Sequence, residues 1–175
     1  LYNYSPGWNV FILIKASLRD NPWMDELQRW LDKDERSSRM DGIIFIHYDS
    51  PKADLDYLEA TRKADSSKKS LYIIDEVHNF IRNVHSHLSS SAGKRALSIY
   101  EAIIQEKRKN PDVRIVCLTA TPIINIPFEL GLLFNLLRPG IFPSSEQEFD
   151  QLYVSRSAYP TISHNKNMFQ RNILG

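Results

Sequence analysis

The decisive stretch of this sequence is Leu71-Tyr72-Ile73-Ile74-Asp75-Glu76-Val77-His78, in which an apolar run leads directly into charged residues. The run that ends at Ile74 has the pattern of a strand buried in a parallel sheet. Asp75 and Glu76 would then stand at the carboxyl end of this strand, where open parallel sheets bind their ligands. The stretch therefore predicts an α/β fold with a functional edge.

A second tetrapeptide, Thr119-Ala120-Thr121-Pro122, follows another apolar run, from Val113 to Leu118. An Asp-Glu pair after a strand is by itself equally compatible with a solvated strand end. Two such boxes at the ends of two strands favour the functional interpretation, because parallel strands bring their carboxyl ends to one edge of the sheet.

Paired carboxylates at a strand end suit the hydrolysis of a nucleoside triphosphate. One carboxylate can hold Mg²⁺, usually through water, while the metal bridges the β- and γ-phosphates, and the other can orient the attacking water. We assign the first role to Asp75 and the second to Glu76. His78 would hydrogen-bond toward the γ-phosphate or toward the hydroxyls of Thr119 and Thr121, which would couple the nucleotide state to that loop.

The rest of the chain alternates strands with helices. Two more buried strands are expected at residues 9–14 and 42–46. The first expected helix is capped by Asn21 and begins at Pro22, with Trp23, Leu27, Trp30 and Leu31 on one face. Leu55 and Leu58 mark a second helix, and a third is expected between Gly93 and Asn110. A fourth, at 127–137, is ended by Pro139-Gly140, and the capping box at 145–148 opens a fifth. This alternation predicts a parallel sheet wound in βαβ units.

The composition bounds the class of protein. A chain of 175 residues with 42% hydrophobic and 25% charged residues has room for one α/β domain, or most of one, with a sizeable core. The net charge of +1 argues against a histone-like or tail-like nucleic-acid binder, although a few loops can still contact phosphates. No apolar run has the length needed to span a bilayer, so no membrane partner is expected.

The two boxes resemble motifs II and III of superfamily-two DExH helicases, on the residues Asp75 to His78 and Leu118 to Pro122. The stretch from Thr121 to Asn125 and the turn Leu137-Arg138-Pro139-Gly140-Ile141-Phe142 are similar to the Swi/Snf-type branch. Three further stretches are similar to helicases of large nucleocytoplasmic DNA viruses: His78-Asn79-Phe80-Ile81, Gly93-Lys94-Arg95-Ala96 and Lys166-Asn167-Met168-Phe169-Gln170-Arg171.

This resemblance implies a RecA-like fold of the P-loop NTPase type, with a parallel sheet flanked by helices and incomplete at both ends. Residues 1–143 would form part of a first RecA-like ATP-binding domain, and residues 144–175 a helical extension toward a second motor domain. The phosphate-binding pattern Gly-x-x-x-x-Gly-Lys-Ser/Thr occurs nowhere in the chain, and its expected place is just before Leu1. The chain is therefore expected to be an internal segment of a longer protein and to be inactive alone.

Nucleic-acid contacts are expected at two places. The stretch Leu13 to Leu18 occupies the position of motif Ia, where Lys15 and Ser17 would contact phosphates. Its Lys-Ala departs from the proline-containing version that the family often has, and a simple strand-to-helix turn is the alternative. Lys94 and Arg95 stand at a helix start as further candidates, with a solvated surface as their alternative.

The resemblance implies an ATP-dependent helicase or double-strand translocase that uses ATP and Mg²⁺ and moves on DNA or RNA. Viral transcription or genome handling is its expected setting, with the viral transcription machinery as a partner. The expected location is intracellular: the host cytoplasm (the virus factory) or the virion, with the nucleus as a further option. The alternative from another class is a non-catalytic helicase-like scaffold in a transcription complex, which the intact Asp75 and Glu76 disfavour. A different P-loop NTPase is disfavoured by the Thr-Ala-Thr-Pro box.

Several other features are expected to be structural. The single cysteine, Cys117, lies within a predicted core strand, which favours packing over reactivity. Neither a partner cysteine nor metal-ligand spacing accompanies His47, His85, His87 or His164, so no zinc site is expected. The segment 91–94 ends in Gly-Lys but lacks the spacing of a phosphate loop, and the basic run 107–109 suits a helix end.

Overall fold

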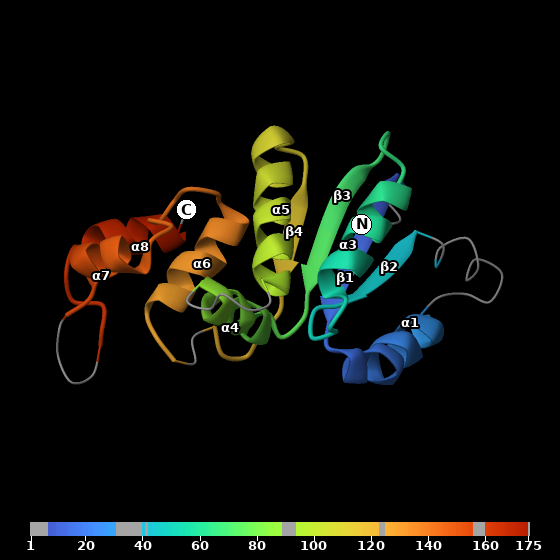
Figure 1. Cartoon of the computed structure of the whole chain (residues 1–175), viewed down its shortest axis with the longest axis horizontal. Helices are drawn as coiled ribbons and strands as arrows, with labels where there is room; N and C mark the ends of the chain where they lie inside the picture. The colour runs from blue at the N-terminus through green and yellow to red at the C-terminus, as the bar shows by residue number, and fades with distance from the viewer. Residues whose placement is uncertain are drawn as a thin grey trace.

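A parallel sheet organises the chain, as the sequence predicts (Figure 1). The computed structural model describes residues 7–30, 40, 42–88, 94–122, 125–155 and 160–174. Leu31, residues 91–93 and residues 123–124, which the sequence interpretation used, lie outside these ranges. The described strands pair in the order β2-β1-β3-β4, and their bounds are Trp8–Ile14 for β1, Ile43–His47 for β2, Lys69–Ile74 for β3 and Arg114–Cys117 for β4.

Helices α3 and α5 lie side by side over one face of the sheet, and the remaining helices extend from its carboxyl edge and its β4 side (Figure 1). The bounds of the α-helices are Asp25–Trp30 for α1, Ala53–Lys63 for α3, Val77–Leu88 for α4, Arg95–Lys109 for α5, Phe128–Leu137 for α6, Glu146–Tyr153 for α7 and Lys166–Leu174 for α8. This α/β arrangement around a parallel sheet agrees with the RecA-like class expected from the sequence.

The two inner strands, β1 and β3, bury side chains on both faces of the sheet. In β1, Phe11 and Leu13 belong to the main core under the helices, whereas Val10, Ile12 and Ile14 form a smaller cluster on the opposite face. This two-sided burial explains why the strands read as continuous apolar runs rather than as alternating patterns.

β4 is more exposed than β3, the strand beside it. In the described part of the chain it pairs with β3 alone. Val116 and the following Leu118 each keep 39% of their surface exposed, and Arg114 is also exposed. The sequence predicts β4 as a buried strand, but this prediction holds only for its inner face, because nothing described packs on its outer one.

Helix α3 forms where the sequence predicts a helix, but its buried face differs from the expected one. Leu55 and Leu58 are 60% and 59% exposed, whereas Ala53, Tyr57 and Ala60 face the core. The small alanines let the helix approach the sheet closely, and the Tyr57 hydroxyl lies 3.2 Å from the Tyr72 hydroxyl of β3.

Helix α1 also presents a different face from the one predicted. Trp23 and Leu27 are half-buried, but Trp30 is 81% exposed. The indole N–H of Trp30 donates to Glu26 of the same helix, and α1 lies beside the carboxyl edge instead of across the sheet (Figure 1). Asn21 has extended dihedral angles, φ −131° and ψ 121°, as a residue before a helix does, and the regular α-helix begins at Asp25.

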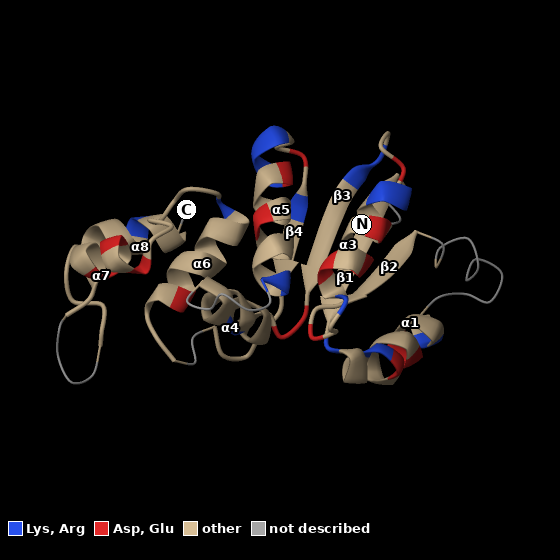
Figure 2. Ribbon diagram, viewed as in Figure 1, with Lys and Arg blue, Asp and Glu red and all other residues tan. Residues whose placement is uncertain are grey.

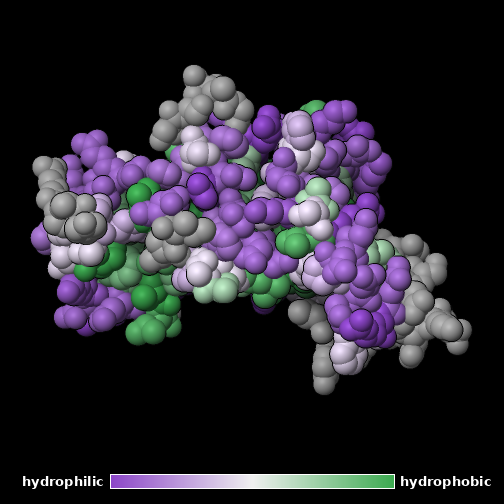
Figure 3. All heavy atoms as spheres, turned by 90° about the horizontal axis from the view of Figure 1, so that it is seen from below, coloured by the Kyte–Doolittle hydropathy of each residue, from purple (hydrophilic) through white to green (hydrophobic). Residues whose placement is uncertain are grey.

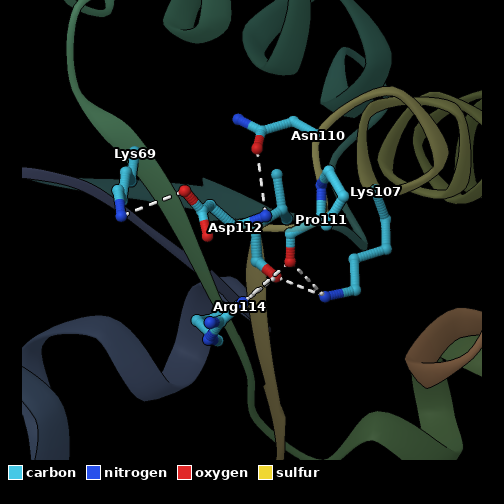
Figure 4. Close-up of polar contacts among 7 residues, drawn as sticks. Lys69, Lys107, Asn110, Pro111, Asp112 and Arg114 are labelled. Atoms are coloured by element: carbon cyan, nitrogen blue, oxygen red, sulfur yellow. Dashed lines mark hydrogen bonds and ion pairs between the residues drawn. The ribbon is translucent and has the colours of Figure 1, made fainter.

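The turn between α5 and β4 is held at the amino edge of the sheet by basic side chains (Figure 4). Lys107 donates to the backbone carbonyls of Pro111 and Val113, and Arg114 donates to the Pro111 carbonyl at 2.8 Å. Lys69 at the start of β3 pairs with Asp112 at 3.0 Å, which lowers the pKa of that carboxyl. Lys107 therefore has the structural role that its position at a helix end suggests.

The C-terminal helices pack on the same core as the sheet. Ser145 caps α7 by accepting a hydrogen bond from the Glu148 backbone N–H, as the capping box predicts. The Phe142 ring lies 5.7 Å from that of Phe149 of α7 and 5.2 Å from that of Phe169 of α8. These contacts cross the boundary expected at residue 143, which stays a prediction.

We predict that Gly131→Ala destabilises the fold. A Cβ at Gly131 would come within 2.9 Å of the Phe149 ring, so the ring or the helix must shift within the aromatic cluster. Such overpacking costs about 1–3 kcal/mol, which outweighs the roughly 1 kcal/mol that alanine gains over glycine within a helix. Chemical denaturation measures the difference. The control is Gly7→Ala, whose Cβ would meet nothing within 4 Å, and equal stability of the two variants would contradict the prediction.

Candidate active site

The two boxes meet at one edge of the sheet. β3 pairs with β4 in a register that places Ile74 opposite Cys117. Leu118 donates its backbone N–H to the Ile74 carbonyl at 2.9 Å, and Val77 donates to the Leu118 carbonyl at 3.0 Å. Adjacent strands therefore end in Asp75-Glu76 and in Thr119, as the sequence predicts, although their chemical roles stay predictions.

Seen from this edge, the surface over the strand ends is mainly hydrophilic (Figure 3). Acidic loops follow the strands there, and basic residues stand at the start of α5 on the same side (Figure 2). The edge thus presents both charges, which is what a site for a metal-bound phosphate chain needs.

His78 joins the two boxes. Its Nδ1 atom lies 2.7 Å from Thr119 Oγ1 and 3.1 Å from Glu76 Oε2. An unprotonated Nδ1 would set its lone pair against the Glu76 carboxylate, so the geometry favours the form in which Nδ1 carries the hydrogen and donates. Of the contacts expected for His78, the structure shows the one to the Thr119 hydroxyl.

The threonine loop is closed by its own hydrogen bonds. Thr119 Oγ1 accepts the Thr121 backbone N–H at 3.1 Å and donates to the Thr121 carbonyl at 3.1 Å. With its single hydrogen used in this way, the Thr119 hydroxyl is an acceptor toward His78. Thr121 therefore contributes to this hydrogen-bonded group through its backbone N–H and carbonyl.

Glu76 has an unusual backbone conformation for its residue type. Its φ angle is +47°, in the left-handed region where a Cβ costs about 1–2 kcal/mol. Its carboxylate is partly exposed and lies against His78. Strain of this kind is held in place by surrounding structure and gathers at functional sites, which fits the predicted role of Glu76.

Asp75 is held on both carboxylate oxygens. Oδ1 accepts the Glu76 backbone N–H at 2.9 Å, and Oδ2 accepts the indole N–H of Trp23 at 2.7 Å. The sequence interpretation missed Trp23 as a site residue, because it reads only as one apolar position on a helix. No local pattern could have shown the contact, since the two residues are 52 positions apart.

The Asp75 backbone is fixed from the neighbouring strands. Its N–H donates to the Leu13 carbonyl of β1 at 3.0 Å, and the Tyr48 hydroxyl, just after β2, donates to its carbonyl at 3.3 Å. Burial, together with the charges of Asp49, Asp75 and Glu76, raises the pKa of Tyr48 well above its ordinary value. The phenol therefore stays protonated and remains a donor.

The predicted nucleic-acid contacts lie at the same edge. Lys15 follows the end of β1, and Ser17 is exposed in the turn Ala16–Leu18, whose first N–H donates to Asp49 at 3.1 Å. Lys94 is exposed before Arg95, where α5 begins at the carboxyl edge (Figure 2). Their contacts with phosphate stay predictions.

The donors at this edge fit a magnesium ion. Asp75 supplies the carboxylate oxygens that Mg²⁺ prefers, and each of them keeps acceptor capacity beyond its one protein donor. Within the residues that can be described, no three His, Cys, Asp or Glu side chains gather into a metal cluster. Magnesium in phosphoryl-transfer sites does not need one, because water and phosphate oxygens complete its shell.

Cys117 is a packing residue. It is partly buried and packs against the main core, and burial raises the pKa of its thiol to about 12, which leaves very little thiolate near neutral pH. Among the helices in the described ranges, none is long and apolar enough to cross a membrane.

Fold and site together define a RecA-like α/β domain with an acidic box and a threonine box on adjacent strand ends. The chain belongs to the SNF2-related domain family, which matches residues 1–172.

Curated relatives of the chain come from large DNA viruses. It is 51% identical, over its whole length, to a protein of Acanthamoeba polyphaga mimivirus whose name is that of an ATP-dependent RNA helicase. It is 32% identical, over 81% of its length, to the nucleoside triphosphatase I of Melanoplus sanguinipes entomopoxvirus and to that of Choristoneura fumiferana entomopoxvirus. The chain spans 23% of the mimivirus protein and 21% of each entomopoxvirus protein.

We predict that glycine is better tolerated than alanine at position 76. Glycine relieves the strain of the positive φ angle, so Glu76→Gly should be about 0.5–1 kcal/mol more stable than Glu76→Ala in chemical denaturation. The control pair lies at Glu101, an exposed position inside α5, where glycine should instead be less stable than alanine by roughly 1 kcal/mol. The same order of stability at both positions would show that Glu76 is not strained.

Proposed function

We propose that this chain is part of an ATP-driven motor that moves along DNA or RNA as a helicase or double-strand translocase. The observation that carries the proposal is the bridge from Glu76 through His78 to Thr119, which connects the ends of two adjacent strands. A carboxylate that stands on a strained backbone and is tied to a neighbouring loop would couple hydrolysis to movement. Membership of the SNF2-related domain family and the names of the viral relatives support the same function.

Asp75 and Glu76 divide the chemistry of hydrolysis. Asp75 would hold Mg²⁺ through water, with a carboxylate whose direction is set by its two protein donors. The metal, when bound, neutralises charge that develops on the transferred phosphoryl group. Glu76 would orient the attacking water and accept a proton from it as a general base. Its side chain is partly exposed and can reach the water, while its backbone is held in one conformation.

His78 would transmit the state of the site to the threonine loop. An N–H donated to both Glu76 and Thr119 ties the position of the carboxylate to that of the loop. When Glu76 turns toward a water, the hydrogen bond from His78 is redistributed toward Thr119. The position of the Glu76 carboxylate would thus affect the threonine loop through the His78 side chain alone.

The partners and the setting follow from the same proposal. Lys15, Ser17, Lys94 and Arg95 would contact the phosphates of DNA or RNA, with the other motor domain completing the track. The viral origin of the relatives supports a role in viral transcription or genome handling, alongside the viral transcription machinery. We place the protein inside infected cells, in the cytoplasmic virus factory or the virion, with the nucleus as a further option.

We predict that Glu76→Gln abolishes most ATP hydrolysis and spares nucleotide binding. The amide keeps the size of the side chain but loses the charge that polarises water, so turnover by the complete protein should fall by roughly 10²–10⁴-fold. Asp75→Asn should weaken Mg-nucleotide affinity as well as turnover, because the metal loses a charged anchor. Nucleic-acid-stimulated phosphate release and nucleotide affinity are measured side by side.

The matched control is Glu59→Gln on α3, whose carboxylate pairs with Lys63 away from the site and should leave turnover unchanged. Glu76→Gln that hydrolyses ATP at the parental rate would refute the role of Glu76. A parent that shows no turnover with any DNA or RNA would favour the non-catalytic scaffold instead.

We predict that Thr119→Val weakens the stimulation of ATP turnover by nucleic acid. Valine keeps the shape of threonine but cannot accept the hydrogen bond of His78, and it also loses the two hydrogen bonds with the Thr121 backbone. Loss of the contact with His78 costs about 0.5–1.5 kcal/mol, which corresponds to a roughly 2- to 13-fold effect. Thr119→Ser retains the hydroxyl and should restore the stimulation. Thr121→Val is the control, since its hydroxyl is not the one that contacts His78, and equal losses at both positions would contradict the bridge.

A further inference from the structure

The carboxylate of Asp75 is oriented by donors from two separate parts of the chain. The Glu76 backbone N–H, at 2.9 Å from Oδ1, comes from the adjoining residue and moves with Asp75. The Trp23 indole N–H, at 2.7 Å from Oδ2, comes from the segment that follows β1. Without the second donor, the carboxylate would be free to rotate about its last bond, because a single contact to a neighbouring residue does not fix its plane.

Trp23 can serve as a rigid donor because its ring is anchored. The indole is half-buried and packs against the smaller apolar cluster on the sheet, which includes Ile12, Ile14 and Leu71. A hydrogen bond from a packed ring to a charged acceptor is short and directional. The ring therefore aims its one N–H at the acidic box from a fixed base.

The segment that carries Trp23 also carries the predicted contacts to nucleic acid. Lys15 and Ser17 precede it, and the turn Ala16–Leu18 is held to the loop after β2 by the Ala16 N–H, which donates to Asp49. Helical turns at Arg19–Met24 lead from this turn to Trp23. A displacement of residues 15–18 by a bound phosphate would be passed to the indole within a few residues.

We propose that Trp23 is a positioning residue that sets the direction of the Asp75 carboxylate and links it to the nucleic-acid-contacting segment at residues 15–18. This inference rests on the proposed function. It adds a connection from the segment at residues 15–18, which would contact nucleic acid, to the carboxylate that would hold the metal. Trp23 acts through Asp75, as outer groups around a metal site orient the ligands inside them.

Replacement of the donor tests the proposal on the complete protein. Trp23→Phe keeps an apolar ring and removes the N–H. The affinity for Mn²⁺, measured by electron paramagnetic resonance in the presence of ADP, should fall by roughly 10-fold, the lower end of the effect of losing an outer-shell partner. This measurement reports metal binding without turnover, so a slow step elsewhere in the cycle does not affect it.

The chain offers a matched control in Trp30→Phe. The Trp30 indole also donates to a carboxylate, Glu26 at 3.1 Å, but it is 81% exposed and belongs to α1 away from the acidic box. Trp30→Phe should bind Mn²⁺ with parental affinity. Equal affinities for the parent and Trp23→Phe would overturn the inference and leave the proposed function standing, whereas a parent that binds no Mn²⁺ with nucleotide would overturn both.

A second variant separates the hydrogen bond from packing. Incorporation of 3-benzothienylalanine at position 23 keeps the size of the indole and replaces its N–H with sulfur. This variant should lose Mn²⁺ affinity to the same extent as Trp23→Phe, and it decides the question if the smaller phenyl ring prevents folding. Parental affinity in the benzothienyl variant would show that Trp23 only fills space.

The connection between Trp23 and the nucleic-acid-contacting segment is tested by the stimulation of ATP turnover by nucleic acid. The ratio of ATP turnover with saturating nucleic acid to turnover without it should fall at least roughly 3-fold in Trp23→Phe, since coupling between two sites typically spans 5- to 150-fold and one of its paths is lost. Trp30→Phe should keep the parental ratio. A parental ratio in Trp23→Phe at saturating metal would overturn the link.

Discussion

The parallel pairing of β3 with β4 is the constraint on which the candidate site depends. Backbone hydrogen bonds continue past the strands, from Leu118 to Ile74 and from Val77 to Leu118, so the register is fixed up to the first residues of both boxes. A slip of one residue would turn the Thr119 side chain to the opposite face of the sheet. His78 reaches both Glu76 and Thr119 only because this register holds.

Much of this architecture is local in origin and could be predicted from the sequence. The apolar run before Asp75 and the capping box at Ser145 each specify an element through neighbouring residues. The buried face of α3 could not be predicted in this way. Leu55 and Leu58 are the most apolar residues of that helix, yet the close approach to Tyr72 selects the face with Ala53 and Ala60.

In the candidate site too, some features could be predicted from local sequence and others depend on contacts between distant residues. Its position followed from two boxes at two strand ends, and the sequence offered Thr119 among several partners for His78. The contact of Trp23 with Asp75 depends on how a segment after β1 folds back over the edge, which no spacing reveals. The left-handed conformation of Glu76 was equally hidden, because a glycine signals such a position and a glutamate does not.

The exposure of β4 has a consequence for how the site is maintained. With Val116 and Leu118 partly exposed and pairing to β3 alone among the described strands, β4 is held by fewer contacts than β1 or β3. We therefore expect the free energy of opening β4 locally to be lower than that of global unfolding, a difference that amide hydrogen exchange would measure. Such an opening would separate Thr119 from His78, whereas Asp75 would stay held by β1 and Trp23. The threonine box thus belongs to a weaker cooperative unit than the acidic box, and any surface that covers β4 would raise the fraction of molecules in which both boxes are assembled.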